Sequence, residues 1–281
     1  MPGGYYILPA APRRGDARAN GADGRSEVST PRILVTNDDG IHAPGIALLE
    51  KFAAALSDDV WVVAPDAEQS GAAHSLSLSE PLRLREIAPR RFALKGSPTD
   101  CAVFACNFLT RDRKPDLLLS GINRGANLAD DVTYSGTVAA AMEGAILGIP
   151  SIAISQVFTR GAPVPWETAE RFGPDLLRQL MALRLPKGVL LNINFPDVPP
   201  DRVTGLRVTR QGQRTRQEIL VHDRIDGRGL PYFWLSFQHD ASDPAADTDL
   251  EAVAAGAISV TPLHLDLTHE PTLSLLRRAL A

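Results

Sequence analysis

The stretch that decides the fold is ILVTNDDG, residues 33–40, in which a short apolar run passes directly into a polar loop. The run Ile33–Thr36 predicts a buried strand. Helical spacing of apolar residues follows over Ile46–Leu56. A strand, a loop and a helix in this order predict the first unit of an α/β domain.

The same alternation continues along the chain. Further strands are predicted at Val60–Ala64, Leu117–Ser120, Ser151–Ile154 and Val189–Asn194, and helices at Thr99–Thr110, Gly136–Leu147 and Thr168–Leu183. Between Ser75 and Glu86 apolar and polar residues alternate, which predicts an antiparallel strand or hairpin. The repeated alternation of strand and helix predicts an α/β fold with a doubly wound, mostly parallel sheet.

The two ends of the chain depart from this pattern. Residues 1–30 are rich in Gly, Ala, Arg and Asp without apolar periodicity, which predicts a disordered extension or an over-called start before a domain at 31–281. Residues 197–256 hold strand-like and aromatic segments between polar stretches, and we expect a C-terminal β-rich arm for oligomerisation. A strand at Ala257–Leu263 and a helix at Thr272–Leu280 are expected to return to the main body.

Composition bounds the class of protein. With 281 residues, 44% of them hydrophobic, the chain can bury the core of one large domain. The net charge of -4, with both signs interspersed, argues against general nucleic-acid binding. No apolar run is long enough to span a membrane, and the first residues lack the order of a secretion signal. Cys101 and Cys106 are predicted to be reduced core residues. We therefore expect a cytoplasmic enzyme.

Ligands of an open parallel sheet bind at the carboxyl ends of its strands, so the first loop is a candidate site. Asp38 and Asp39 are adjacent there, and two carboxylates held together repel each other unless a cation offsets the repulsion. Oxygen ligands favour Mg²⁺ or Mn²⁺ over zinc. Gly40 allows a sharp turn or a close approach to a ligand. The alternative is ordinary turn chemistry in which Asp39 caps the following helix.

Two further loops add polar groups. Ser70 is a candidate neutral ligand, although a turn serine there and a hydrogen-bonded surface histidine at His74 fit the local sequence better. Asn123 can ligate a metal through its amide oxygen. Asn127 and the residues Ser135, Gly136 and Thr137 lead into a helix whose free N–H groups favour a phosphate. Ser135 and Thr137 can also act as helix caps.

Several common sites are absent from the sequence, namely G-x-x-x-x-G-K-[ST], G-x-G-x-x-G, G-x-S-x-G and H-E-x-x-H. Walker NTPases, dinucleotide enzymes, serine hydrolases and zincins therefore lose support.

Five segments together resemble motifs of the SurE family, the metal-dependent survival-protein nucleotidases. They occur in order and read ILVTNDDGI (33–41), VAP through QSG (63–71), GSPTD (96–100), SGINRGAN (120–127) and YSGTVAAAME (134–143). The resemblance covers Arg32–Pro196 well. Beyond it only NINFP at 192–196 corresponds, and the extension before Pro31 is not needed by the family's core.

The resemblance implies a Rossmann-like domain with an exchanged C-terminal arm, in a homodimer or homotetramer. It implies a 5′-nucleotidase, a phosphoric monoester hydrolase that releases phosphate from nucleoside 5′- and 3′-monophosphates. One divalent metal ion per subunit, Mg or Mn, is expected on Asp38, Asp39, Ser70 and Asn123. The expected substrate-binding residues are Gly40, Asn127, Ser135, Gly136 and Thr137.

Asp38 and Asp39 are also the candidate catalytic residues. We expect a metal-activated water, oriented or deprotonated by one of these aspartates, to attack the phosphate. Direct attack by a carboxylate is disfavoured, because aspartyl-phosphate enzymes of the haloacid dehalogenase type show Asp-x-Asp rather than adjacent aspartates. The alternative function is a non-catalytic module that binds metal and nucleotide and regulates through its oligomeric surface.

Overall fold

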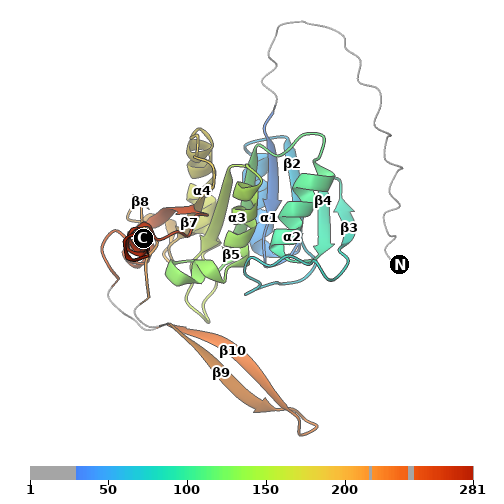
Figure 1. Ribbon diagram of the computed structural model, residues 1–281. Coiled ribbons are helices and arrows are strands. Elements are labelled where there is room, and N and C mark those ends of the chain that lie inside the picture. The colour runs from blue at the N-terminus through green and yellow to red at the C-terminus, as the bar shows by residue number, and fades with distance from the viewer. Residues whose placement is uncertain (1–29, 215–216, 240–243, 281) are drawn as a thin grey trace, which may run out of the picture.

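The computed structural model describes residues 30–214, 217–239 and 244–280, which form a nine-stranded sheet and a separate two-stranded arm (Figure 1). The strand order in the sheet is β3-β4-β2-β1-β5-β6-β7-β11-β8. Six strands are parallel: β1 (Arg32–Thr36), β2 (Asp59–Pro65), β4 (Arg91–Lys95), β5 (Leu117–Arg124), β6 (Ser151–Gln156) and β7 (Val189–Phe195). The predicted α/β fold with a doubly wound, mostly parallel sheet is confirmed.

The other strands of this sheet lie at its two edges. At one edge β3 (Arg83–Ala88) runs antiparallel to β4. At the other edge β11 (Ile258–His264) runs antiparallel to β7, and β8 (Leu206–Val208) pairs with β11 in parallel. The strand predicted at Ala257–Leu263 is therefore confirmed, and it returns to the main body as expected.

Strand β1 is the point from which the sheet is wound in both directions. Leu34 in β1 is aligned with Trp61 in β2 on one side and with Leu118 in β5 on the other. The chain first builds β2 and β4 outward from β1, and it then returns to place β5 on the opposite side. Such a reversal opens a crevice beyond the carboxyl ends of the two strands, which is where α/β proteins bind ligands.

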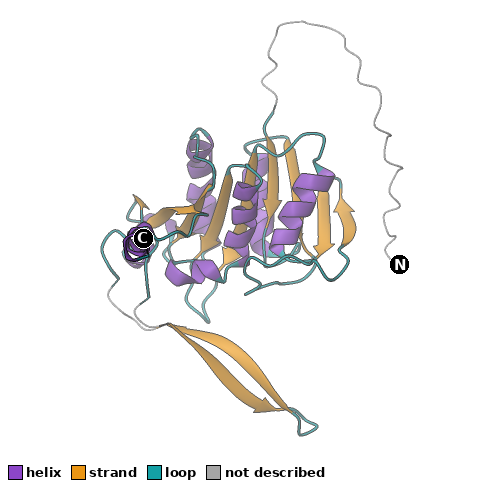
Figure 2. Cartoon of the chain, viewed as in Figure 1, coloured by secondary structure: helices purple, strands orange, loops and turns teal. Residues whose placement is uncertain are grey.

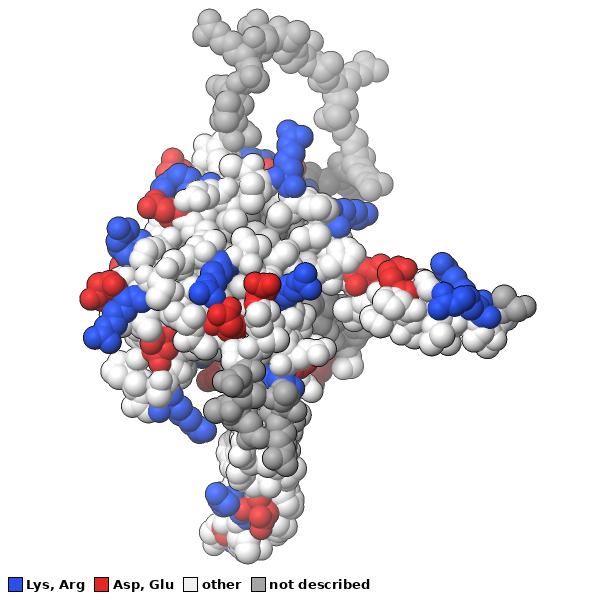
Figure 3. All heavy atoms as spheres, turned by 90° about the vertical axis from the view of Figure 1, so that its left-hand side faces the viewer, with Lys and Arg blue, Asp and Glu red and all other residues white. Residues whose placement is uncertain are grey.

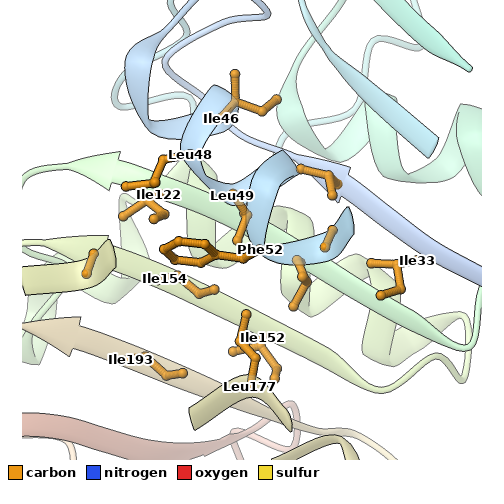
Figure 4. Close-up of a cluster of buried hydrophobic side chains, with 14 of the residues drawn as sticks. Ile33, Ile46, Leu48, Leu49, Phe52, Ile122, Ile152, Ile154, Leu177 and Ile193 are labelled. Carbon is orange, nitrogen blue, oxygen red and sulfur yellow. The ribbon is translucent and has the colours of Figure 1, made fainter. Parts of the chain in front are cut away.

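Helices cover both faces of the sheet (Figure 2). On one face α1 (Pro44–Ala54) and α4 (Trp166–Met181) pack on Ile33, Val35 and Ile152, and Figure 4 shows Phe52 of α1 within this cluster. On the other face α2 (Pro98–Phe104), continued by the π-helix η1 (Ala105–Leu109), and α3 (Gly136–Ile146) pack on Leu34. Because both faces are covered, the central strands carry continuous apolar runs rather than an alternating pattern.

The arm is a hairpin of β9 (Gln217–Ile225) and β10 (Pro231–His239), which pair only with each other in the described part of the chain. It extends away from the main body (Figure 1). Its apolar side chains are largely exposed, among them Phe233, Trp234 and Leu235. A two-stranded hairpin with this much apolar surface in water is marginally stable on its own, which indicates that something covers it.

The C-terminal helices differ in how they pack. Helix α5 (Asp249–Ala254) buries Asp249 and Ala252 against the body. Helix α6 (Glu270–Ala279) has no buried residue and projects from the body (Figure 3). The expected return of this helix to the main body is therefore wrong. Its apolar residues, including Leu275 and Leu276, are about half exposed, so it has no core contact in one chain.

Two other expectations about local structure need correction. The alternating stretch Ser75–Glu86 is a loop as far as Leu82, and only its last part forms β3. The reason is that the backbone N–H of Ser77 donates to Asp100 instead of to a neighbouring strand, while Leu76 and Leu78 are exposed. Strand β4 was not predicted. The extension expected over residues 1–30 lies, except for Thr30, outside the described residues.

Short 3-10 turns occur at η2 (Ala129–Thr133) and η3 (Pro200–Arg202). Cys101 and Cys106 are free and buried, as predicted. Charges of both signs are interspersed on the face in Figure 3. No helix of the described residues is both long enough and apolar enough to cross a membrane.

Candidate functional site

The acidic pair lies in a tight turn at the carboxyl end of β1. The side chain of Asn37 closes this turn, because its Oδ1 accepts from the backbone N–H of Gly40 (3.2 Å) and its Nδ2 donates to the Gly40 carbonyl (3.0 Å). Gly40 has a φ of +96°, a conformation that favours glycine. The helix that follows is capped by Ala43 without a side-chain bond. The alternative in which Asp39 caps this helix is therefore wrong.

Both aspartates are held in surroundings that disfavour their charge. Burial raises the pKa of Asp38 to about 6, and the neighbouring Asp39 adds to the rise, although a hydrogen bond from the Thr137 hydroxyl opposes it. Burial also raises the pKa of Asp39, whose Oδ2 accepts from the backbone N–H of Arg124 (3.0 Å). In the described part of the chain neither carboxylate forms an ion pair with a Lys or Arg side chain.

The first turn of α3 lies directly against Asp38. Ser135 is the N-cap, and its Oγ accepts from the backbone N–H of Val138 (3.0 Å), so its predicted capping is confirmed. Thr137 does not cap; its hydroxyl donates to Asp38 Oδ1. A Cβ on Gly136 would lie 2.8 Å from the Cβ of Asp38. The positive end of the helix dipole is therefore next to this carboxylate.

The end of β5 adds two amides. Asn123 donates through Nδ2 to the carbonyl of Gly125 (3.0 Å), and its amide oxygen has no hydrogen-bond partner among the described residues. Asn127 donates through Nδ2 to Ser155 Oγ (2.8 Å), and its backbone N–H and carbonyl are bound by the side chains of Asn192 and Asn194. These buried bonds fix Asn127 at the ends of β6 and β7.

The loop after β2 brings Ser70 to the same place. The backbone N–H of Gln69 donates to the carbonyl of Asp38 (2.8 Å), which ties this loop to the acidic turn. Ser70 is exposed, and its hydroxyl donates to Glu68 Oε1 (2.8 Å). His74 lies further along, where its Nε2 is 3.0 Å from Glu143 Oε2. It is thus a hydrogen-bonded, partly exposed histidine, as the local sequence favoured.

These groups meet in a hollow of about 310 Å³. It is bordered by three predicted metal ligands, Asp38, Ser70 and Asn123, and by two predicted substrate-binding residues, Asn127 and Ser135. Asp39 borders an adjoining hollow of about 280 Å³, which shares Ser70 and Arg124 with the first. Gly40, Gly136 and Thr137 support the hollow without lining it. Another hollow, of about 390 Å³, lies on Phe172 and Leu206 and shares no lining residue with these two.

The donor set is made of oxygen atoms. The donors are two carboxylates that form no ion pair, one hydroxyl and one free amide oxygen. Such a set suits a hard divalent ion, which would remove the repulsion between the aspartates. The described residues contain no cluster of three or more His, Cys, Asp and Glu that could hold a metal. A site here therefore depends on the neutral oxygens of Ser70 and Asn123.

Sequence patterns missed three residues around the hollow. Arg124 supplies the backbone N–H for Asp39, and its guanidinium lies 5.3 Å from the ring centroid of Phe158. Tyr134 and Phe237 border the hollow and contact each other. The aromatic stretch Tyr232–Phe237 was a visible signal, but nothing in the local sequence connects it with a loop so far away along the chain.

Fold and site together define an α/β protein with an oxygen-donor acidic site at the reversal point of its sheet. A family model described as survival protein SurE matches residues 33–218. The chain belongs to the SurE family.

Similar proteins extend over most of the chain. A 5′-nucleotidase SurE of Parvibaculum lavamentivorans is 57% identical over 258 residues, which cover 91% of this chain and 93% of that protein. A protein of the same name from a Methylobacterium species is 55% identical over 89% of this chain and 99% of its own length. The crystal structure of SurE from Aquifex aeolicus superposes with a TM-score of 0.76 at 39% identity, covering 89% of this chain and all of that chain.

Proposed function

We propose that this chain is a 5′-nucleotidase, which hydrolyses nucleoside 5′-monophosphates, and also 3′-monophosphates, to nucleoside and phosphate. The names of its relatives support this proposal. The observation that carries it is the meeting of Asp38, whose neighbour Asp39 borders the adjoining hollow, with the N-terminus of α3. A doubly charged phosphate ester fits between a cation held by the first group and the N–H groups of the second.

The proposed cofactor is one Mg²⁺ or Mn²⁺ per subunit, held by Asp38, Asp39, Ser70 and Asn123. A divalent ion there supplies charge neutralisation for the phosphate and lowers the pKa of a bound water. Thr137 and the N–H of Arg124 orient the two carboxylates by hydrogen bonds. The Ser70 hydroxyl donates its proton to Glu68, which leaves the lone pairs of its oxygen available to the ion.

The phosphate is bound, in this proposal, at the start of α3. Its oxygens accept hydrogen bonds from the backbone N–H groups at Gly136 and Thr137 and from the side chains of Asn127 and Ser135, beside the turn at Gly40. One of the two aspartates orients a water and accepts its proton. The water oxygen bonds to phosphorus, the bond from phosphorus to the ester oxygen breaks, and the nucleoside leaves after taking up a proton.

The proposed assembly is a homodimer or homotetramer in which the β9–β10 arm of one subunit packs on another. Its support is the exposed apolar surface of the hairpin, which a second copy would cover. The proposed compartment is the cytoplasm, where the buried thiols of Cys101 and Cys106 stay reduced.

The test is release of inorganic phosphate from adenosine 5′-monophosphate by the purified chain. Activity should depend on added Mn²⁺ or Mg²⁺, disappear with a chelator and return with excess metal. Asp38→Asn should remove it while circular dichroism shows a folded protein. Tight binding of the nucleotide without phosphate release would contradict the proposal and favour the non-catalytic module. A covalent phosphoenzyme would contradict the attack by water.

A further inference from the structure

Two aromatic rings border the candidate site and come from distant parts of the chain. Tyr134 directly precedes Ser135, the N-cap of α3, and Phe237 belongs to strand β10 of the arm. Their ring centroids are 5.3 Å apart and the rings are inclined by 54°. Both line the hollow that also contains Asp38 and Asn123. The arm of the chain therefore contributes to the wall of its own site.

The two rings keep much of their surface uncovered. Tyr134 is 40% exposed and Phe237 is 47% exposed, although they contact each other. Both rings line the polar hollow next to the start of α3, where aromatic side chains can pack against a flat ligand.

Hydrogen bonds fix the loop that carries Tyr134. The backbone N–H of Tyr134 donates to the carbonyl of Asp131 (3.0 Å), and its carbonyl accepts from Ala73 (3.3 Å). Asp131 in turn pairs with Arg214 at the base of the arm (2.5 Å). The loop and the arm are thus joined at the same point.

A buried carboxylate strengthens this junction. Asp249 accepts hydrogen bonds from the backbone N–H groups of Ala129 (2.9 Å) and Gly212 (2.8 Å), so it joins the loop before Tyr134 to the segment that enters the arm. Within the arm, His222 Nε2 and Ser236 Oγ are 2.7 Å apart across the two strands, next to Phe237. These contacts hold the two rings in a defined position, which a stacking site requires.

We propose that Tyr134 and Phe237 bind the nucleobase of the substrate by stacking, so that this pair makes the site select nucleotides over phosphate esters without a base. The inference rests on the proposed function. Ser135 at the start of α3 and the two rings line the same hollow, so a nucleotide whose phosphate binds there has both rings in the wall around it. Stacking does not read the edge of a base, so all nucleobases bind, and purines, with the larger face, bind best.

The experiment compares kcat/KM for adenosine 5′-monophosphate and for ribose 5-phosphate, which has the same reacting group and no base. Stacking on an aromatic side chain changes binding by an amount that corresponds to about 5- to 150-fold. We expect Phe237→Ala and Tyr134→Ala to lower kcat/KM for the nucleotide by such a factor, mainly through KM, and to leave ribose 5-phosphate unchanged. Phe237→Tyr, which keeps the ring, should retain the preference.

The matched control is Phe233→Ala. Phe233 lies on the same strand and the same face as Phe237, and it is 63% exposed. It should keep the preference for the nucleotide. An equal loss for both substrates in Phe237→Ala, or the same selective loss in Phe233→Ala, would overturn the inference in favour of a structural role of the arm. An unchanged preference in Phe237→Ala would also overturn it. Wild-type protein that releases phosphate from neither substrate would instead contradict the proposed function.

Discussion

The two ends of strand β1 place aspartates in opposite surroundings. At the amino end Asp59, the first residue of β2, lies within 2.8 Å of Arg32 and 3.2 Å of Arg90. At the carboxyl end Asp38 and Asp39 are adjacent, and among the described residues neither forms an ion pair with a Lys or Arg side chain. Burial raises the pKa of Asp59, but the hydrogen bonds from Arg32 and Trp61 and the charges of Arg32 and Arg90 together lower it below its usual value. For Asp38 burial dominates and the pKa is raised. Paired carboxylates thus stabilise the fold, and unpaired carboxylates are kept at a cost that indicates function.

The largest expected effect is on catalysis at the carboxyl end. Asp38→Asn keeps an oxygen that can accept from Thr137 but removes the charge that holds a cation, so phosphate release should fall by at least about 100-fold. The same change removes a buried, unneutralised charge, so the free energy of unfolding of the metal-free protein should rise by about 1–2 kcal/mol. Urea denaturation measures this rise. A variant that is both inactive and clearly less stable would contradict the comparison.

A second prediction concerns the close packing behind Asp38. Gly136→Ala places a methyl group 2.8 Å from the Cβ of Asp38, so either the aspartate or the first turn of α3 has to shift. A misplacement of about 1 Å at a reacting centre can lower activity by about 100-fold, and we expect a loss of that order in kcat/KM. Gly227→Ala is the control, because its added Cβ meets nothing within 4 Å. Equal activity in the two variants would show that α3 does not position Asp38.

Asp249 is an intermediate case, a buried carboxylate bound by backbone N–H groups rather than by a cation. It accepts from Ala129, Gly212 and Leu250. In Asp249→Asn an amide NH₂ group replaces one carboxylate oxygen and faces backbone N–H donors. The free energy of unfolding should therefore fall by about 1–3 kcal/mol. Denaturant titration checks this, with the exposed residue Asp201→Asn as control. A loss of stability in the control as large as that in Asp249→Asn would contradict this assignment.

The smallest effect is expected at the amino end. The pKa of Asp59 is lowered in the folded protein, so its contribution to stability is present above the unfolded pKa and is lost as the pH falls through the folded pKa. Asp59→Asn should therefore be less stable than wild type at pH 7 by about 0.5–1 kcal/mol, with a difference that shrinks as the pH falls below the unfolded pKa of Asp. Urea denaturation between pH 7 and pH 3 measures it. Unequal phosphate release by the two proteins would be unexpected, because Asp59 lies at the opposite end of the sheet.

The sequence predicted the carboxyl end of the sheet better than its edges. Strand β1 and its acidic turn are local features, since a short apolar run and the residues Asn37–Gly40 determine them almost alone. Strand β4 pairs with β2 and β3, and such pairing depends on contacts that no local pattern records. The loop at Ser77 looked like a strand because its alternation is real, but Asp100 takes the backbone N–H that a strand would need.

The same limit applies to the site. The adjacency of Asp38 and Asp39, and the capping by Ser135, follow from neighbours in the sequence. The hydrogen bond from Thr137 to Asp38 and the contact between Tyr134 and Phe237 join segments far apart in the chain. Helix α6 was expected to return to the main body, but amphipathic spacing does not determine which surface covers the apolar face of a helix.

The central claim is that the unpaired carboxylates at the end of β1 hold a divalent cation, and calorimetric titration with Mn²⁺ tests it most directly. Wild-type protein and Asp59→Asn should each bind one ion per subunit with the same affinity, and Asp38→Asn should show no binding under the same conditions. Binding by Asp38→Asn that equals wild type, or no binding by wild type, would contradict the account.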